Sequence, residues 1–469
     1  MGILDKIISL VNDVIWSPAL VVLLVCAGLY FSARTGFVQV RRFGLMLRAL
    51  FAPAERHEDG RKKGISSFEA FCVALSGRVG TGNIVGVATA IALGGPGAIF
   101  WMWVIAFFGA STAFMEATLA QQFKFQHKNG YRGGPSSYIE KGLGCKWLAV
   151  LFSVITLVAC GMLLPSVQAN GVSTACVNAF QLPPIACGLG FAFLLGLVIV
   201  GGIKSVSKVA SVVTPFMAFA YLIVTFIVIG GHIEMVPGVF KMIVTNAFGI
   251  HPLAGGILGS TIMMGVKRGI FSNEAGQGGG AIVSASASVS HPAKQGLAQA
   301  FSVYVDTLLV CTATALLILC SGTYNILDAK TGEMLVASAP ELGANYVGFT
   351  QGGIDSVLAG FGSAFVSIAL LFFSFTTVMA YYFYGESSIN YLFSGKMSGS
   401  KAEKLVIWIY RFLILGTVVF GAVKEADTIW KMGDIGVGLM AWINVIALLL
   451  LCPHALRALK EYESSLKHK

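Results

Sequence analysis

Two glycine-rich stretches combine charged and amide side chains with residues that can unwind a helix, and both lie inside hydrophobic segments. The first reads Ser76-Gly-Arg-Val-Gly-Thr-Gly-Asn-Ile-Val-Gly86, and the second reads Gly265-Val-Lys-Arg-Gly-Ile-Phe-Ser-Asn-Glu-Ala-Gly-Gln-Gly-Gly-Gly280. Glycine tolerates backbone conformations that other residues avoid. An unwound turn exposes main-chain N–H and C=O groups that can bind ions and charged ligands. These residue types therefore predict ligand binding through the main chain.

Close helix packing is the alternative interpretation, because small residues also let membrane helices approach one another. We favour packing for isolated glycines such as Gly94, Gly97 and Gly109. We favour binding for the two stretches above, because their charged and amide side chains sit in the same turns as the glycines.

The composition places the chain in a lipid bilayer. Of its 469 residues 56% are hydrophobic and 12% are charged, and the mean hydropathy is +0.79. A helix needs about 20 residues to cross a hydrocarbon core. Segments of this kind recur along the chain and predict an all-α polytopic protein of about eleven transmembrane helices, at 14–32, 68–93, 98–122, 147–172, 185–202, 209–231, 253–285, 297–320, 356–385, 404–423 and 427–451.

The predicted helices form a single transport domain over residues 1–469, built from two halves. When the segment 14–32 is set aside as an extra N-terminal helix, the other helices divide into a first repeat, 68–231, and a second repeat, 253–451. Each glycine-rich stretch then opens its half. Discontinuous helices at matching positions of two halves indicate a transporter whose binding site lies near the bilayer midplane.

The basic residues predict the orientation, because Lys and Arg are retained in cytoplasmic loops. One alternate set of connections carries most of them, within 34–63, 124–146, 204–208 and 396–404 and in the tail 452–469. This bias predicts an inner-membrane protein with its N-terminus outside and a cytoplasmic C-terminal tail. The net charge of +10 is thus a topology signal, and we expect no nucleic-acid partner.

Three segments carry a resemblance to a known family. They are Ser76 to Thr89, Gly269-Ile-Phe-Ser-Asn-Glu-Ala-Gly-Gln to Gly279, and His291 to Gly296 with Val305-Asp-Thr307. Together they resemble the alanine or glycine:cation symporter family, the sodium:alanine symporters. The resemblance implies a leucine-transporter-like fold, with discontinuous first and sixth core helices in two inverted repeats. It also implies import of a small neutral amino acid, alanine or glycine, together with Na⁺.

An amino-acid zwitterion needs partners for its carboxylate and its ammonium group. Main-chain N–H groups at the first break would face the carboxylate at the positive end of a helix dipole. Carbonyl and amide groups at the second break would accept from the ammonium. The expected substrate residues are therefore Gly80, Thr81, Gly82 and Asn83, then Asn273, Gly276 and Gln277, with Gln168 and Tyr381 as candidates for the pocket wall that could equally serve helix packing.

Sodium prefers about five or six oxygen ligands, so its sites should combine carbonyls with hydroxyl, amide or carboxylate groups. A first group joins the carbonyls of Ser76 and Val79 to the hydroxyls of Thr376 and Thr377. The resemblance makes this the sodium position shared by the fold. The alternative is that these hydroxyls bond only to carbonyls one turn back in their own helix.

A second cation group would use Asn83, Asp306 and Glu274. Acids inside a membrane are costly and usually functional or paired. Asp306 could instead form an ion pair with Arg78, Lys267 or Arg268. For Glu69 and Glu116 we expect structural roles.

Other classes fit less well. An intramembrane hydrolase needs a base near its nucleophile, yet all seven histidines fall in predicted loops or at span ends. No His, Cys and acid cluster has zinc-ligand spacing, and no repeated filter loop indicates a channel. We expect no enzyme activity. A related transporter of glutamine, or one coupled to protons, remains the serious alternative, and the sequence gives no oligomeric state.

Overall fold

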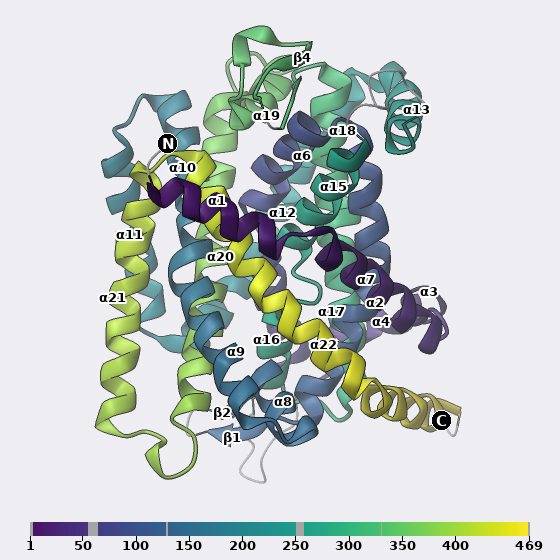
Figure 1. The fold of residues 1–469 in the computed structure, drawn as a ribbon, viewed down its shortest axis with the longest axis vertical. Helices are drawn as coiled ribbons and strands as arrows, with labels where there is room; N and C mark the ends of the chain where they lie inside the picture. Colours follow the sequence, from purple (N-terminus) through teal and green to yellow (C-terminus); the bar gives the residue numbers. More distant parts are fainter. Residues whose placement is uncertain (1–2, 55–63, 128–129, 250–257, 330, 468–469) are drawn as a thin grey trace.

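The computed structural model describes residues 3–54, 64–127, 130–249, 258–329 and 331–467, and most of them are helical. The strands in this part form two short antiparallel hairpins, β1 (Phe125–His127) with β2 (Gly130–Arg132) and β3 (Asn325–Leu327) with β4 (Met334–Ala337). The hairpins lie at opposite ends of the helix bundle (Figure 1). The all-α prediction is confirmed.

Helices lie at most of the predicted spans, but the number of eleven spans is not confirmed. In the described part, eight helices are long and apolar enough to cross a membrane, and one bent pair would make a ninth. The start of the predicted span 253–285 and parts of the basic connections, at 55–63 and 128–129, lie outside the described residues. The helices at the predicted spans are α2 (Pro18–Arg34), α7 (Gly97–Gln122), α9 (Lys146–Val158) with α10 (Leu164–Phe180) as one span, the shorter α11 (Pro184–Ile199), α12 (Gly202–Gly231), α17 (Pro292–Val303) with α18 (Thr312–Ser321) as one span, α20 (Gly362–Leu392), α21 (Lys401–Val423) and α22 (Ala426–Lys467).

Shorter elements connect these helices. Two of them, α3 and α4, follow the first span. The connecting elements are α3 (Val38–Arg41), α4 (Phe43–Leu50), α8 (Pro135–Leu143), η3 (Ile233–Met235), α13 (Val236–Ala247), η5 (Pro340–Leu342), α19 (Tyr346–Asp355) and η6 (Gly395–Met397).

The two ends of the chain differ from the expected boundaries. A further helix, α1 (Ile3–Ile15), precedes the first span and packs against α22, where the Trp16 indole N–H donates to the Asp434 carbonyl at 2.8 Å. The hydropathy pattern misses α1 because Asp5, Lys6 and Asp13 interrupt its apolar residues. At the other end, α22 continues through Pro453 to Lys467, so most of the tail is helical.

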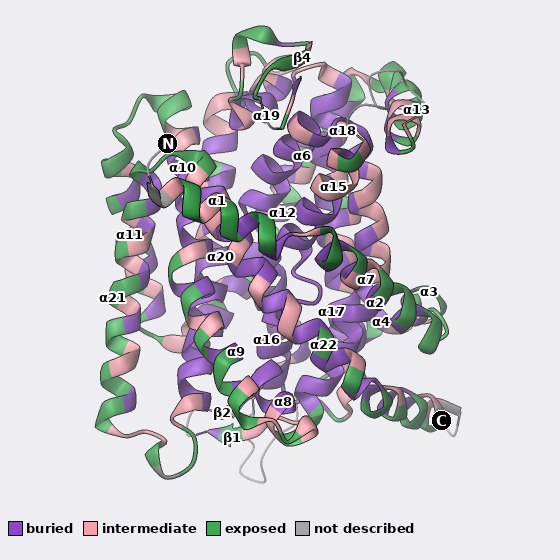
Figure 2. Cartoon of the chain, viewed as in Figure 1, coloured by how far each residue is buried: buried purple, intermediate pink, exposed green. Residues whose placement is uncertain are grey.

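Burial separates an inner group of helices from an outer one. Helices α7, α16 (Gly279–Ser286) and α17 are mainly buried and pack against one another, whereas α11 and α21 stand together at one edge with exposed faces (Figure 2). The exposed residues there are large and apolar, such as Leu197 at 65% and Phe412 at 68%. Apolar side chains on an outer helix surface are stable in contact with lipid.

The first glycine-rich stretch is a broken helix. Helix α5 (Ser67–Arg78) begins with a capping box in which Ser66 and Glu69 bond reciprocally, so Glu69 has the expected structural role. After α5 ends, a π-helical turn, η1 (Gly82–Gly86), leads into α6 (Val87–Gly94). The angle between Ser67–Arg78 and Gly82–Gly94 is 50°.

The second stretch is also interrupted. Helix α15 (Leu258–Asn273) stops before the turn 274–278, and α16 then begins at Gly279. Three residues of the turn have positive φ: Glu274 at 54°, Gly276 at 91° and Gly278 at 94°. Glycine accepts these angles, whereas Glu274 is a non-glycine residue in a strained conformation. Both helix interruptions therefore occur where the glycines predict them.

Candidate substrate and cation site

Arg78 ties the two broken helices together. It is the last residue of α5, and its Nε donates to the carbonyl of Asn273, the last residue of α15, at 2.7 Å. Its Nη1 donates to Gln299 Oε1 at 3.0 Å and also to Ser302 Oγ on α17. Only 1% of Arg78 is exposed. The guanidinium thus fixes the end of one break against the end of the other.

Oxygen atoms converge on the hydroxyl of Thr377. This α20 side chain lies 2.8 Å from the carbonyl oxygen of Ser76, 3.2 Å from that of Val79 and 2.9 Å from that of Phe373. A hydroxyl has one proton, so it can satisfy only one of the three carbonyls fully. Carbonyl and hydroxyl oxygens are ligand types that suit a small hard cation.

The hydroxyl of Thr376 does not contact the carbonyls of Ser76 and Val79. Its hydroxyl bonds to the carbonyls of Phe372 and Phe373 and lies 3.5 Å from the sulfur of Met217 on α12. This is the alternative foreseen for hydroxyls inside helices, a bond to the preceding turn. Of the first predicted cation group, Ser76, Val79 and Thr377 come together.

Asn83 and Asp306 form the centre of the second predicted group. Asn83 Nδ2 donates to Asp306 Oδ1 at 2.7 Å, and both residues are fully buried. Asn83 lies on η1, and Asp306 lies on a second π-helical segment, η4 (Tyr304–Cys311). The carboxylate also accepts from Ser272 Oγ at 2.9 Å and Thr307 Oγ1 at 2.7 Å. A π-helical turn widens a helix and often marks a functional position.

Glu274 does not join this pair. Its Oε2 accepts from the hydroxyl of Tyr384 on α20 at 3.0 Å. Residue 274 follows α15, so its main chain stays beside the site while its carboxylate is directed to α20. The structure therefore brings together Asn83 and Asp306 of the second predicted group.

The ion-pair alternative for Asp306 has no counterpart in the described part of the chain, where no basic group lies within 4.0 Å of its carboxylate. Two of the proposed partners pair elsewhere: Lys267 Nζ lies 2.8 Å and Arg268 Nη2 2.5 Å from Asp434 Oδ2 on α22. The Arg268 guanidinium also lies over the rings of Phe271 and Trp430. This buried cluster joins α15 to α22 about five residues before the second break.

Replacing Asp434 by Asn should lower the stability strongly. Removal of one member of a buried ion pair leaves uncompensated charge and costs about 3–5 kcal/mol. We expect a clear fall in the melting temperature of the purified protein in detergent. Asp427 is the matched control, since it pairs with Lys431 on the same helix but its side chain is 68% exposed, and Asp427→Asn should change little. Equal losses in both variants would contradict the structural role of the cluster.

The N–H groups of the first break are capped by side chains. The Gly80 N–H donates to Asn83 Oδ1 at 2.8 Å, and the Thr81 N–H donates to Gln168 Oε1 of α10 at 2.9 Å. Gly82 lies against the second break, because a Cβ there would come within 3.2 Å of the Ser272 Cα. These are the N–H groups expected to face a carboxylate.

The second break is also capped. The carbonyl of Asn273 accepts from Arg78, and the carbonyl of Gly276 accepts from Asn444 Nδ2 on α22 at 2.8 Å. Gln277 Nε2 donates to the Ile270 carbonyl at 2.6 Å. The side-chain nitrogen Nδ2 of Asn273 has no hydrogen-bond partner in the described residues.

The two wall candidates lie next to the first break. Gln168 Oε1 accepts the Thr81 N–H, and the side chain of Tyr381 on α20 lies next to that of Gln168. Only 2% of Tyr381 is exposed. Gln168 and Tyr381 thus stand together at the capped turn, where a bound carboxylate would compete with Gln168.

Gly80 is the point at which this site tolerates no side chain. A Cβ on Gly80 would lie 2.6 Å from Thr377 Oγ1 and 2.7 Å from Gln168 Oε1. Gly80→Ala should therefore displace both side-chain groups and reduce the uptake rate of the expected amino-acid substrate by roughly tenfold. Gly86, at the end of η1, is the control, since its Cβ would meet no atom closer than 3.8 Å. Uptake rates of the two variants in proteoliposomes test this, and a Gly80→Ala protein with normal uptake would contradict it.

Sequence reasoning missed several residues of this region. Ser272 and Thr307 complete the shell of Asp306, and each stands beside a residue that was singled out. Asn444 was missed although a buried amide inside an apolar run is costly and therefore informative. It donates to Glu116 Oε2 at 3.0 Å as well as to Gly276. Glu116, expected to be only structural, thus contacts the group that clips the second break.

Two interrupted helices meet inside a bundle of apolar helices, and buried oxygen atoms lie near both interruptions. This arrangement is typical of membrane transporters with discontinuous helices. The chain belongs to the sodium:alanine symporter family, whose model matches residues 1–469. Membership makes the protein a symporter and not an enzyme, with sodium as the coupling ion.

Individual relatives agree with the family. YrbD of Bacillus subtilis (strain 168), whose name proposes a sodium/proton-dependent alanine carrier, is 49% identical over 99% of this chain and 93% of its own. The sodium/proton-dependent alanine carrier protein of Bacillus sp. (strain PS3) is 46% identical over 86% of this chain and 89% of its own. GlnT of Bacillus subtilis (strain 168), whose name proposes a sodium/glutamine symporter, is 43% identical over 98% of this chain and 91% of its own.

A solved structure is more distant. A manganese transporter of Eremococcus coleocola aligns with 83% of this chain and 94% of its own at 12% identity, with a TM-score of 0.39. A similarity this low adds nothing to the assignment.

Proposed function

We propose that this symporter imports a small neutral amino acid, alanine or glycine, together with Na⁺. The observation that carries the proposal is the oxygen cluster at Thr377, where an α20 hydroxyl meets the carbonyls of Ser76 and Val79 in the first break. A cation bound there would hold α20 and the broken helix in one arrangement. The second break, clipped to the first by Arg78, lies beside it.

Substrate binding would exchange partners at the capped turns. The carboxylate would take the Gly80 and Thr81 N–H groups, and Asn83 Oδ1 and Gln168 Oε1 would be released. The freed Asn83 oxygen could then turn to a second cation beside Asp306. The ammonium would find carbonyl oxygen and the Asn273 side chain at the second break. Gly80 and Gly82 leave little space, which favours a small side chain.

This exchange would couple the two solutes. Cation and substrate order the same turns, so binding of one lowers the ordering cost of the other, and the effect is reciprocal. Moving one positive charge inward down 100 mV releases about 2.3 kcal/mol. That is enough to concentrate the substrate tens-fold.

Alternating access would come from rocking of one helix group against the other around the fixed site. In this proposal the halves 68–231 and 253–451 are inverted repeats, with residues 14–32 as an extra helix. The basic residues support an N-terminus outside the inner membrane and a cytoplasmic C-terminus.

Glutamine is the second candidate substrate, and the name of GlnT favours it. Protons are a second candidate coupling ion. The names of YrbD and of the Bacillus sp. carrier include them, and a buried carboxylate such as Asp306 can bind either a proton or a metal cation.

Reconstitution of the purified protein in liposomes distinguishes these possibilities. Uptake of labelled alanine, glycine and glutamine is measured with an inward Na⁺ gradient, with an inward proton gradient and with neither. We expect accumulation of alanine or glycine that depends on Na⁺. Accumulation of glutamine alone would overturn the proposed substrate, and transport that never exceeds equilibrium would overturn symport.

A further inference from the structure

A basic pocket opens between the end of α2 and the last third of α22, away from the site described above. It has a volume of about 310 Å³ and is lined by Arg34, Pro453, Leu456, Arg457 and Lys460. The wall combines three cations with two apolar residues, and it contains no acidic residue. Such a pocket suits a ligand that carries a negative charge next to hydrocarbon.

The charges of the pocket are available to a ligand. Arg34, Arg457 and Lys460 are exposed, and in the described part of the chain none of them has a carboxylate within 4.0 Å. Among the described residues the Arg34 side chain makes one hydrogen bond, from Nη1 to the Tyr30 hydroxyl at 3.2 Å, and its guanidinium lies over the Tyr30 ring. A guanidinium has five N–H donors, so most of those of Arg34 remain unused.

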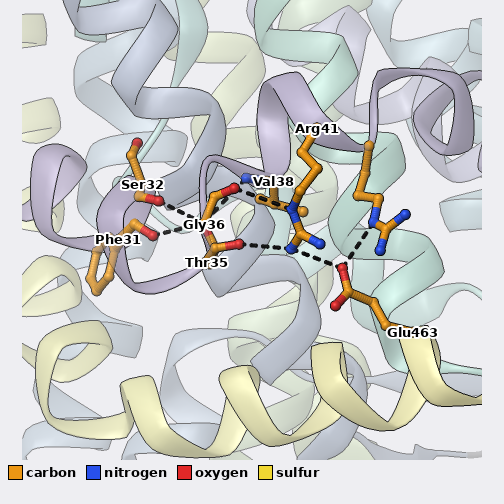
Figure 3. A network of polar contacts seen from close by, with 8 residues as sticks. Phe31, Ser32, Thr35, Gly36, Val38, Arg41 and Glu463 are labelled. Carbon is orange, nitrogen blue, oxygen red and sulfur yellow. Dashed lines mark hydrogen bonds and ion pairs between the residues drawn. The ribbon is translucent and has the colours of Figure 1, made fainter.

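The frame of the pocket is held by other basic residues. Glu463 on α22 lies 2.9 Å from both Arg41 Nη2 and Arg42 Nε (Figure 3). Arg41 also donates to the carbonyls of Thr35 and Gly36 just after α2 (Figure 3). This network fixes the end of α2 relative to α22. It also uses the nearby carboxylate, so Glu463 does not neutralise the pocket.

Next to the pocket, both α2 and α22 expose apolar side chains. On α22 the residues Ile446, Leu450, Pro453, Arg457 and Lys460 are spaced by three or four and share one helix face. Ile446 is 44% and Leu450 62% exposed. Large exposed apolar side chains followed by cations, in that order along one face, match an acyl chain followed by its headgroup.

The second wall has the same order. On α2 the exposed residues Leu29 and Tyr30 precede Arg34 at the end of the span. The cations of the pocket thus lie at the end of two apolar spans, at the depth of lipid headgroups. The basic residues assign this end of the bundle to the cytoplasm.

We propose that the pocket of Arg34, Arg457 and Lys460 binds the phosphate of an anionic phospholipid, whose acyl chains lie along the exposed faces of α2 and α22. An acidic peptide would find the charges but would leave the apolar stripe beside them without a partner. The ligand chemistry, a phosphate monoanion, is shared with inorganic phosphate, and the experiment separates the two sources.

The experiment measures binding to the full-length protein in detergent by fluorescence anisotropy of a tail-labelled phosphatidylglycerol. The pocket variant carries Arg34→Gln, Arg457→Gln and Lys460→Gln. The matched control carries Lys204→Gln, Lys208→Gln and Lys404→Gln, which remove the same charge from exposed positions at the same predicted side. The melting temperature of each variant is measured in parallel.

We expect saturable binding that is displaced by dioctanoyl phosphatidylglycerol and not by dioctanoyl phosphatidylcholine or millimolar inorganic phosphate. Each cation near a membrane contributes about 1 kcal/mol to attraction of an anionic lipid, so the pocket variant should bind roughly a hundredfold more weakly. The control should stay within about threefold of the unmodified protein.

Three results would overturn the proposal. Equal weakening in both variants would mean a general attraction of the basic face. Displacement by phosphatidylcholine would mean that the charge plays no part. Displacement by inorganic phosphate as effective as that by the lipid would assign the pocket to a free anion. If the pocket variant melts early, Arg457→Lys, which keeps the charge, must retain binding for the proposal to stand.

Discussion

Replacing Asp306 by Asn should abolish Na⁺-driven accumulation of substrate, with a loss of at least about a hundredfold. The substitution keeps the size of the side chain and removes its charge. In the protein the carboxylate accepts hydrogen bonds from Asn83, Ser272 and Thr307, and it is fully buried. Among the described residues no basic group lies within 4.0 Å of this carboxylate, and a buried negative charge attracts a cation strongly because water cannot screen it. A neutral amide cannot do the same.

Proteoliposomes loaded without Na⁺ and placed in labelled alanine with Na⁺ give the measurement. Asp427→Asn again serves as the control, because it removes one negative charge from an exposed position of α22. Both variants should elute as folded protein on size exclusion. Normal Na⁺-dependent accumulation by Asp306→Asn would exclude this carboxylate from the cation site. Uptake that becomes independent of Na⁺ but still requires protons would move the residue from sodium to proton coupling.

Thr377→Val should raise the Na⁺ concentration for half-maximal uptake by about ten- to a hundredfold. Valine has the shape of threonine and lacks the hydroxyl, so one oxygen ligand is lost while the packing of α20 is kept. The loss of a hydrogen-bonding group at a charged partner costs about 1.5–3 kcal/mol. Uptake measured over a series of Na⁺ concentrations, at constant ionic strength, gives the shift directly.

Thr376, the residue before Thr377, provides the control, because its hydroxyl points in a different direction. Thr376 is also buried on α20, but its hydroxyl faces Met217 and its own helix. Thr376→Val should leave the Na⁺ dependence within about twofold. If the two variants shift the Na⁺ dependence equally, or if Thr376→Val alone does so, the cation lies elsewhere and the convergence of carbonyls at Thr377 is only structural.

The amino-acid sequence by itself determines the solvent of this protein and the place of its breaks. Uninterrupted apolar runs can satisfy their backbone in lipid only as helices, so span positions follow from hydropathy. Glycines beside charged and amide residues in such a run have no favourable place in a continuous helix, which is why the sequence predicts interruptions within 76–86 and 265–280. The three sequence motifs, at 76–89, at 269–279 and at 291–296 with 305–307, carry the resemblance to the sodium:alanine symporters.

Only the tertiary structure decides which side chains meet. Thr376 and Thr377 are adjacent and chemically identical, and the rotation of α20 sends one hydroxyl to the first break and the other to α12. The partners of Asp306 also depend on the rotation of helices, because two π-helical segments shift the faces that a regular period of 3.6 residues would present. The partner of Arg268 proved to be Asp434, 166 residues away along the chain. Local sequence fixes where a helix can form or break, whereas the packing of distant helices fixes the direction of each side chain.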